Sequence, residues 1–285
     1  MNKIIRNIVI VALFTVGGGW LGIWLNNITG NTMPPMQSLG ALIWLTTPAL
    51  SGILLRAIGG DGWKDSGFGL NLISGWKWYL IGILVYPLAA LLTFGLGALL
   101  GIVSADGFAA QGFGAYLSVA GTMFVGSLMK NIFEEFAWRG YLTPRLEAAK
   151  IHPLMNHFIV SLLWMTWHLP YYYYYLDRAL LESALTTSIP VFLVTGYIVM
   201  FPTSILFGEL RLLSKSVWPV FILHNIINAL SMPLLMNGFI KVNGPLGFVF
   251  TPTNEGIITS ILLGVAGWML YQYRMKKEAS EKISV

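Results

Sequence analysis

The sequence predicts an all-α, polytopic membrane protein with about eight transmembrane helices. Of its 285 residues, 56% are hydrophobic and only 10% are charged, whereas soluble globular domains carry about 25% charged residues. The apolar residues are collected in runs of about 18–25, which is the length that a helix needs to cross a bilayer. We therefore expect a single membrane-embedded domain that spans residues 1–285.

The predicted helices follow one another with connections that carry turn-forming residues. Segments rich in Gly, Pro, Asn and Asp separate most of the apolar runs, as turn chemistry requires. The first helix lacks the small-residue cleavage site of a signal peptide, so we expect it to be retained. The fourth run can continue as helix to residue 150. The predicted spans are 8–25, 38–57, 77–102, 115–138, 153–175, 184–208, 216–236 and 256–273.

The basic residues predict the orientation in the membrane. Only Arg178 and Lys241 fall in the predicted outer segments, Lys130 lies within the fourth helix, and every other Lys and Arg falls on the inner side. This positive-inside bias places both termini in the cytoplasm. We expect an integral, multi-pass protein, located in the plasma membrane if the source is prokaryotic.

Composition also excludes several classes of function. The chain contains no cysteine, which excludes disulfides, thiolate metal sites and a cysteine nucleophile. Its net charge of +5 comes from basic residues scattered singly between apolar runs. We therefore expect a lipid bilayer around the chain and no nucleic-acid partner.

Two adjacent carboxylates, Glu134 and Glu135, lie in the fourth predicted helix. Ionisable groups at membrane depth are energetically costly and indicate a functional site. Glu135 and Arg139 are four residues apart, share one helix face and can form an ion pair. Glu134 points about 100° away from Glu135. It is available either to act on another group or to pair with Lys130, four residues before it, in a structural role.

The four histidines differ in their expected roles. Glu134 and His168 are equidistant from Ile151, near the centre of the predicted turn between the fourth and fifth helices. In an antiparallel helical hairpin this register brings the carboxylate and the imidazole to similar depth. His152 and His157 lie at the start of the fifth helix, where interfacial or capping roles are expected.

The seventh predicted helix adds an imidazole and a carboxamide. His224 and Asn228 are one turn apart and share a face, whereas Asn225 lies on a different face. A pair of this kind can simply form hydrogen bonds between helices. Its combination with a carboxylate and a second imidazole favours chemistry instead.

Together these groups fit hydrolysis of an amide inside the membrane. A carboxylate and an imidazole can remove a proton from water and make it nucleophilic. A second imidazole and an amide NH₂ can donate hydrogen bonds to the oxyanion that forms when water attacks. A zinc site is the rival interpretation, because Glu and His are also zinc ligands. The HExxH spacing of common zinc proteases is absent.

Three motifs carry a resemblance to a known family. The run Glu134–Leu142, EEFAWRGYL, resembles the EExxxRG signature of the CPBP family. That family groups type II CAAX prenyl proteases with bacteriocin-processing and immunity-type membrane proteins. The segment Trp164–His168 is similar to its FxxxH motif, with Trp in place of Phe, and His224–Asn228 is similar to HxxxN. The family-like core covers about residues 115–236, and each motif lies on a separate predicted helix.

The resemblance implies a role for each matching residue. Glu134 matches the catalytic glutamate, and His168 matches the histidine that helps it to activate water. His224 and Asn228 match the pair that stabilises the oxyanion.

Supporting residues and cofactors follow from the same resemblance. Glu135 and Arg139 match supporting positions, in keeping with the ion pair expected from their spacing. The implied mechanism is glutamic and needs no cofactor, with zinc at the same Glu/His cluster as the alternative. The expected partner is a membrane-associated peptide or protein substrate, lipidated or not. A non-proteolytic membrane scaffold, a bacteriocin-immunity factor and a transporter are the competing functions.

Two further segments are assigned ordinary roles. Tyr171–Tyr175 follow Pro170 and predict an aromatic belt at the membrane interface, with substrate contact as the alternative. The charged segment from Arg274 to Val285 predicts a solvated cytoplasmic tail.

Overall fold

The computed structural model describes residues 2–283 and is built almost entirely of helices. The long helices are α1 (Lys3–Ile28), α2 (Leu39–Ala57), α3 (Leu72–Leu99), α5 (Phe113–Ala137), α7 (Pro153–Pro170), α9 (Ile189–Ser214), α10 (Trp218–Met236) and α12 (Ile257–Ile283). The short elements are η1 (Pro35–Gln37), β1 (Val103–Ser104), α4 (Asp106–Gln111), η2 (Trp138–Leu142), α6 (Thr143–Ala148), η3 (Tyr171–Tyr175), α8 (Arg178–Ala184), β2 (Lys241–Val242) and α11 (Gly247–Phe250). The two strands pair antiparallel.

Each predicted span corresponds to one long helix, although several boundaries differ. Helix α3 already begins at Leu72, and α9 begins only at Ile189, because Pro190 favours a helix start there and α8 forms a separate helix before it. Helix α12 continues to Ile283 instead of ending near residue 273. Charge pairs four residues apart, such as Arg274 with Glu278, support this extension. The charged segment expected to be a solvated tail is therefore helical as far as it is described.

Within residues 2–283, five helices are long and apolar enough to cross a membrane, namely α1, α2, α3, α9 and α10. Helices α5, α7 and α12 form as predicted but do not belong to this set. Helix α5 carries Lys130 and two glutamates, α7 carries two histidines, and the last part of α12 is charged. These polar residues lower the hydropathy of the three helices. The count of about eight spans therefore remains a prediction for α5, α7 and α12.

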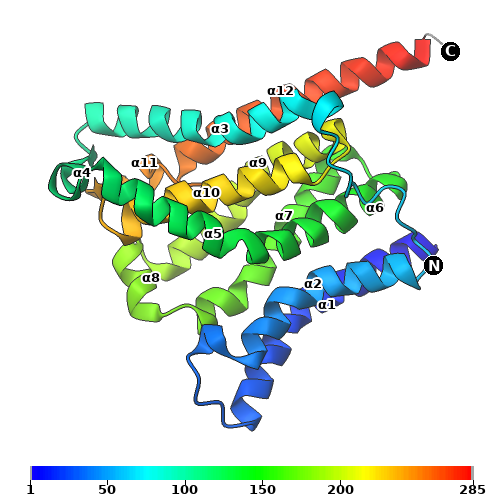
Figure 1. Cartoon of the computed structure of the whole chain (residues 1–285), viewed down its shortest axis with the longest axis horizontal. Helices are drawn as coiled ribbons and strands as arrows, with labels where there is room; N and C mark the ends of the chain where they lie inside the picture. Colours follow the sequence, from blue (N-terminus) through cyan, green and yellow to red (C-terminus); the bar gives the residue numbers. More distant parts are fainter. Residues whose placement is uncertain (1, 284–285) are drawn as a thin grey trace.

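The helices that carry the site motifs lie in the middle of the molecule (Figure 1). In this view α3 and α12 run along one edge, and the α1–α2 pair lies at the opposite side. Helix α5 packs along α10, and α9 packs against both α7 and α12. Helix α10 thus contacts both α5 and α9, and α9 connects it to α7.

Close contacts join α1 to α2, and a pair of indoles joins α2 to the rest of the structure. A Cβ on Gly22 would lie 2.3 Å from the carbonyl oxygen of Gly40, so only glycine permits this helix approach. Helix α2 is joined to α7 by two indoles, which stack with centroids 4.4 Å apart. Trp44 Nε1 donates to the Trp167 carbonyl at 2.8 Å, and Trp167 Nε1 donates to the Trp44 carbonyl at 3.0 Å. This reciprocal pair holds α2 against α7 at the residue that precedes His168.

Candidate active site

Polar side chains join α5 to α10 along one seam. Asn225 Oδ1 accepts hydrogen bonds from Ser127 Oγ at 3.0 Å and from Asn131 Nδ2 at 2.9 Å. Asn228 Nδ2 donates to Asn131 Oδ1 at 2.9 Å. A connected network of this kind fixes the rotation of one helix against the other. It therefore sets the directions in which the two glutamates of α5 point.

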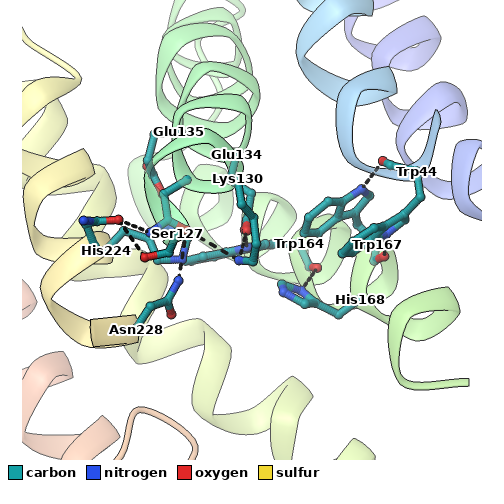
Figure 2. Close-up of polar contacts among 12 residues, drawn as sticks. Trp44, Ser127, Lys130, Glu134, Glu135, Trp164, Trp167, His168, His224 and Asn228 are labelled. Carbon is teal, nitrogen blue, oxygen red and sulfur yellow. Dashed lines mark hydrogen bonds and ion pairs between the residues drawn. The ribbon is translucent and has the colours of Figure 1, made fainter. Parts of the chain in front are cut away.

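Glu134 is buried, and both of its carboxylate oxygens are bonded. Oε1 forms an ion pair with Lys130 Nζ, and Oε2 accepts a hydrogen bond from Trp164 Nε1 at 2.8 Å (Figure 2). The residue is 2% exposed. Glu134 forms the pair with Lys130 that its spacing allows, so the expectation of an unpaired Glu134 is wrong, whereas its catalytic role stays a prediction. The i, i+4 spacing explains the pair, because residues four apart are neighbours on a helix.

Glu135 forms the predicted pair with Arg139 and has a second partner as well. Arg139 NH1 lies 3.2 Å from Glu135 Oε1, and His224 Nδ1 lies 2.7 Å from the same oxygen. Because a carboxylate oxygen accepts, Nδ1 of His224 carries a proton and its Nε2 is left for other contacts. Arg139 is fully buried, and its guanidinium lies 4.2 Å from the ring centre of Trp164. Two supporting residues thus orient the imidazole of His224.

His168 is held by its own helix. Its Nδ1 lies 2.8 Å from the carbonyl oxygen of Trp164, one turn before it. A carbonyl can only accept, so Nδ1 is the protonated nitrogen, and neutral His168 keeps its lone pair on Nε2. No hydrogen bond joins His168 directly to Glu134 in the described part of the chain. Trp164 bridges them, because its indole bonds Glu134 and its carbonyl bonds His168.

These groups surround a cavity of about 230 Å³. Its polar wall includes Lys130, His168, His224, Asn228 and Glu255. Most of the remaining wall is aromatic and aliphatic, including Trp44, Tyr171, Tyr172, Leu176, Phe192, Met200 and Phe248. Glu134 lies directly behind this wall, covered by its two hydrogen-bond partners. The structure therefore brings His168, His224 and Asn228 to one cavity. Glu134, the fourth candidate, is hydrogen-bonded to two residues of the cavity wall.

A widened turn follows the two glutamates. Helix α5 passes into the π-helical η2, in which backbone carbonyls lose their regular α-helical partners. Arg211 Nε donates to the Arg139 carbonyl at 2.9 Å, and Arg56 NH2 donates to the Gly140 carbonyl at 2.6 Å. Arginines from α9 and α2 thus hold the turn that positions Arg139 below Glu135.

The expected role of one histidine needs correction. His152 is exposed at the start of α7, as expected, but His157 is fully buried and bonds Glu209 Oε1 through Nε2 at 2.8 Å. An interfacial role for His157 is therefore wrong. The Tyr171–Tyr175 run forms the π-helical η3, in which Tyr175 is buried against Trp44. Tyr171 and Tyr172 line the cavity, whereas Tyr173 is 76% exposed, so both the interfacial belt and the substrate contact stay predictions.

Sequence reasoning missed several residues of the site. Asn131 lies three residues before Glu134 and four after Ser127, so its spacing was an available signal of a polar helix face. Arg56 and Arg211 gave no local signal, because each acts on a segment far away in the chain.

The fold and the site define a polytopic helical membrane protein with a cluster of ionisable side chains in its interior. Comparison with known protein families then finds a match to part of the chain. Residues 116–230, from α5 to α10, match the family described as type II CAAX prenyl endopeptidase Rce1-like. All three motifs fall within this segment, so the resemblance to the CPBP/CAAX protease family is confirmed, and the family implies a membrane protease. No curated protein matches the chain.

Proposed function

We propose that the chain is an intramembrane endopeptidase of the glutamic type, which hydrolyses a peptide bond of a membrane-associated substrate. The observation that carries this proposal is the shared cavity of His168, His224 and Asn228, with Glu134 directly behind it. A base, an ordered imidazole and hydrogen-bond donors around one space are the groups that amide hydrolysis requires.

In the proposed reaction Glu134, once Lys130 has moved aside, takes a proton from a water molecule that also bonds Nε2 of His168. The water oxygen forms a bond to the scissile carbonyl carbon, and the carbonyl electron pair moves to its oxygen. Asn228 Nδ2 and protonated His224 donate hydrogen bonds to this oxyanion. The carbon–nitrogen bond then breaks, and the leaving nitrogen takes the proton held by Glu134. One water is consumed, and a carboxylic acid and an amine are formed.

Glu135 and Arg139 support this reaction without touching the substrate. Glu135 accepts a hydrogen bond from Nδ1 of His224 and so fixes the orientation of the ring, as the carboxylate of a catalytic triad does. Arg139 holds Glu135 from the other side.

The apolar and aromatic walls of the cavity favour a substrate that carries a lipid or an apolar segment. The family description makes a prenylated CAAX peptide the first candidate, with leader and peptide processing as the other one. We further propose that both termini are cytoplasmic, because nearly all Lys and Arg residues fall on that side. In a prokaryote the protein would lie in the plasma membrane.

The proposed mechanism uses no metal. Within residues 2–283, no group of three or more His, Cys, Asp or Glu side chains is placed to hold a metal ion. A zinc-dependent version at Glu134 and His168 is the alternative. Activity that is lost on exhaustive chelation and restored by zinc would favour that version, whereas full activity after chelation would argue against it.

A cleavage assay tests the proposal. The protein in lipid nanodiscs is given a farnesylated CAAX peptide, and the products are identified by mass spectrometry. We expect His168→Ala to lower kcat by about 10²–10⁴-fold and the exposed control His152→Ala to leave it unchanged. In H₂¹⁸O each new carboxylate should contain one ¹⁸O atom. Wild-type activity in His168→Ala would contradict the proposed role.

The second candidate function is a non-proteolytic scaffold or immunity factor that binds a partner in the same cavity. The covering of Glu134 by Lys130 and Trp164 is the observation that favours it. Such a protein would keep its biological activity after Glu134→Gln, whereas a protease would lose it.

A further inference from the structure

Glu134 must lose one of its two partners before it can bond a water molecule. Lys130 occupies Oε1, and Trp164 occupies Oε2. The carboxylate is 2% exposed and does not form part of the cavity wall. A general base has to lie within hydrogen-bond reach of the proton that it removes. The structure therefore shows a covered form of the base.

Of the two partners, Lys130 is the one that can leave. Trp164 is 3% exposed and is enclosed by aromatic neighbours, with its ring centre 5.4 Å from Phe207 and 5.5 Å from His224. The Lys130 side chain is 31% exposed and lines the cavity. Its flexible four-carbon stem allows the ammonium to move, whereas a packed indole is fixed.

Separating an ammonium from a buried carboxylate costs free energy, and a second anion that binds the ammonium offsets this cost. Lys130 is the one Lys or Arg among the described residues that line the cavity. The acidic residue of the same wall is Glu255, which repels an anion when it is ionised. An anionic group that enters the cavity is therefore directed to Lys130.

We propose that Lys130 recognises a carboxylate of the substrate, namely the C-terminal carboxylate of a peptide that is cut close to its end. Binding of this carboxylate moves the ammonium off Glu134 and frees the base. Three extended residues span at most about 10 Å, so a carboxylate near the scissile bond remains within the same cavity. The inference rests on the proposed protease function and adds the feature by which the substrate is selected.

Two peptides that differ only at the C-terminus test this inference. One farnesylated CAAX peptide ends in a free carboxylate and the other in a carboxamide. A hydrogen bond to a charged group contributes about 1.5–3 kcal/mol, so wild type should prefer the free acid by about 10–150-fold in kcat/KM. Lys130→Met should bring this ratio close to one, because it removes the group that binds the acid and also uncovers Glu134 for the amide peptide. Lys130→Arg should keep the preference.

Lys64→Met is the matched control, because Lys64 is exposed and lies outside the cavity wall. It should leave the ratio unchanged. Equal cleavage of both peptides by wild type would overturn the inference, and so would an equal loss on both peptides in Lys130→Met.

A binding measurement separates this inference from the proposed function. Fluorescence anisotropy gives the affinity of wild type and Lys130→Met for each labelled peptide. If wild type cuts neither peptide, the protease function fails for this substrate. The carboxylate site still stands if the free acid binds at least tenfold tighter than the amide and Lys130→Met abolishes the difference. Equal binding of both peptides would overturn it.

Discussion

Two buried clusters of this molecule contain the same residue types, one Glu, one His and one Arg, in different surroundings. In the first cluster Glu135 Oε1 contacts Arg139 NH1 at 3.2 Å and His224 Nδ1 at 2.7 Å. Its second oxygen, Oε2, has no hydrogen-bond partner among the described residues. His224 lines the cavity.

The second cluster joins α7, α9 and α12. Glu209 Oε2 accepts from Arg274 Nε at 2.6 Å, and Oε1 accepts from Arg274 NH2 and from His157 Nε2, both at 2.8 Å. Both oxygens are thus bonded. Gly208 packs directly against the His157 ring, because a Cβ at this position would lie 2.3 Å from ring atoms.

The difference lies in access to the cavity. In the Glu209 cluster both carboxylate oxygens are bonded and the side chains are buried, which is expected of charges that hold helices together. The Glu135 cluster has a bound, oriented imidazole with one edge on a cavity, which is expected of a group that meets a substrate. Residue type alone does not distinguish the Glu135 cluster from the Glu209 cluster. The following predictions test whether access to the cavity does.

Arg274→Met should give the largest effect, on stability. It leaves Glu209 as a buried carboxylate without its bidentate partner, which typically costs about 3–5 kcal/mol. Thermal unfolding in detergent should show a much lower midpoint, with kcat per folded molecule unchanged. Lys277→Met on the same helix is the exposed control. A stable variant without activity would mean that the enclosed cluster belongs to the site.

Substituting one histidine of each cluster should give opposite results. His224→Ala removes an oxyanion donor and should lower kcat by about 10²–10³-fold with little change in the unfolding midpoint. His157→Ala leaves a cavity and removes a bond to Glu209, so its main effect should be a lower midpoint. Both variants are measured by peptide cleavage and by thermal unfolding. Interchanged results would refute the distinction between the clusters.

Trp164→Phe should have a smaller effect on stability. It keeps the aromatic ring, as in the family pattern, and removes the Nε1–H that bonds Glu134. The lost hydrogen bond to a charged group corresponds to about 1.5–3 kcal/mol. Trp24→Phe, at an exposed position, is the matched control. An unchanged free energy of unfolding would show that the indole bond does not stabilise Glu134.

Glu255→Gln should have the smallest effect, on the pH dependence of KM. Desolvation in the cavity raises the pKa of Glu255, so its carboxyl becomes neutral at a higher pH than an ordinary glutamate. As the pH falls through this range, repulsion of a substrate carboxylate weakens, and KM for the free-acid peptide should fall by about 1.5–5-fold. The variant should have the low KM throughout. The same pH slope in wild type and variant would contradict this role.

Local patterns in the sequence were enough to predict much of the fold and of the site. Apolar runs bounded by turn residues predicted all eight long helices, since length and hydropathy are local properties. The spacing of Glu135 and Arg139 predicted their ion pair for the same reason. The predicted start of α3, start of α9 and end of α12 are wrong, because helix ends also depend on capping and on charge pairs.

Contacts between distant segments could not be predicted. His157 and Glu209 are on different helices, and nothing near either residue indicates the other. The bond from Trp164 to Glu134 depends on the crossing of α5 and α7, which the sequence does not define. The π-helical η2 is stabilised by Arg56 and Arg211 from two other helices. Each of these features is a tertiary contact between segments that are distant in the sequence.

The most direct test of the account is the turnover of Glu134→Gln on the farnesylated free-acid peptide. Glutamine keeps the size of the side chain but cannot accept a proton from water, so kcat should fall by about 10²–10⁴-fold. Glu182→Gln, on the exposed side of α8, is the matched control and should cleave like wild type. Cleavage at the wild-type rate by a folded Glu134→Gln protein would contradict the claim that Glu134 activates the water.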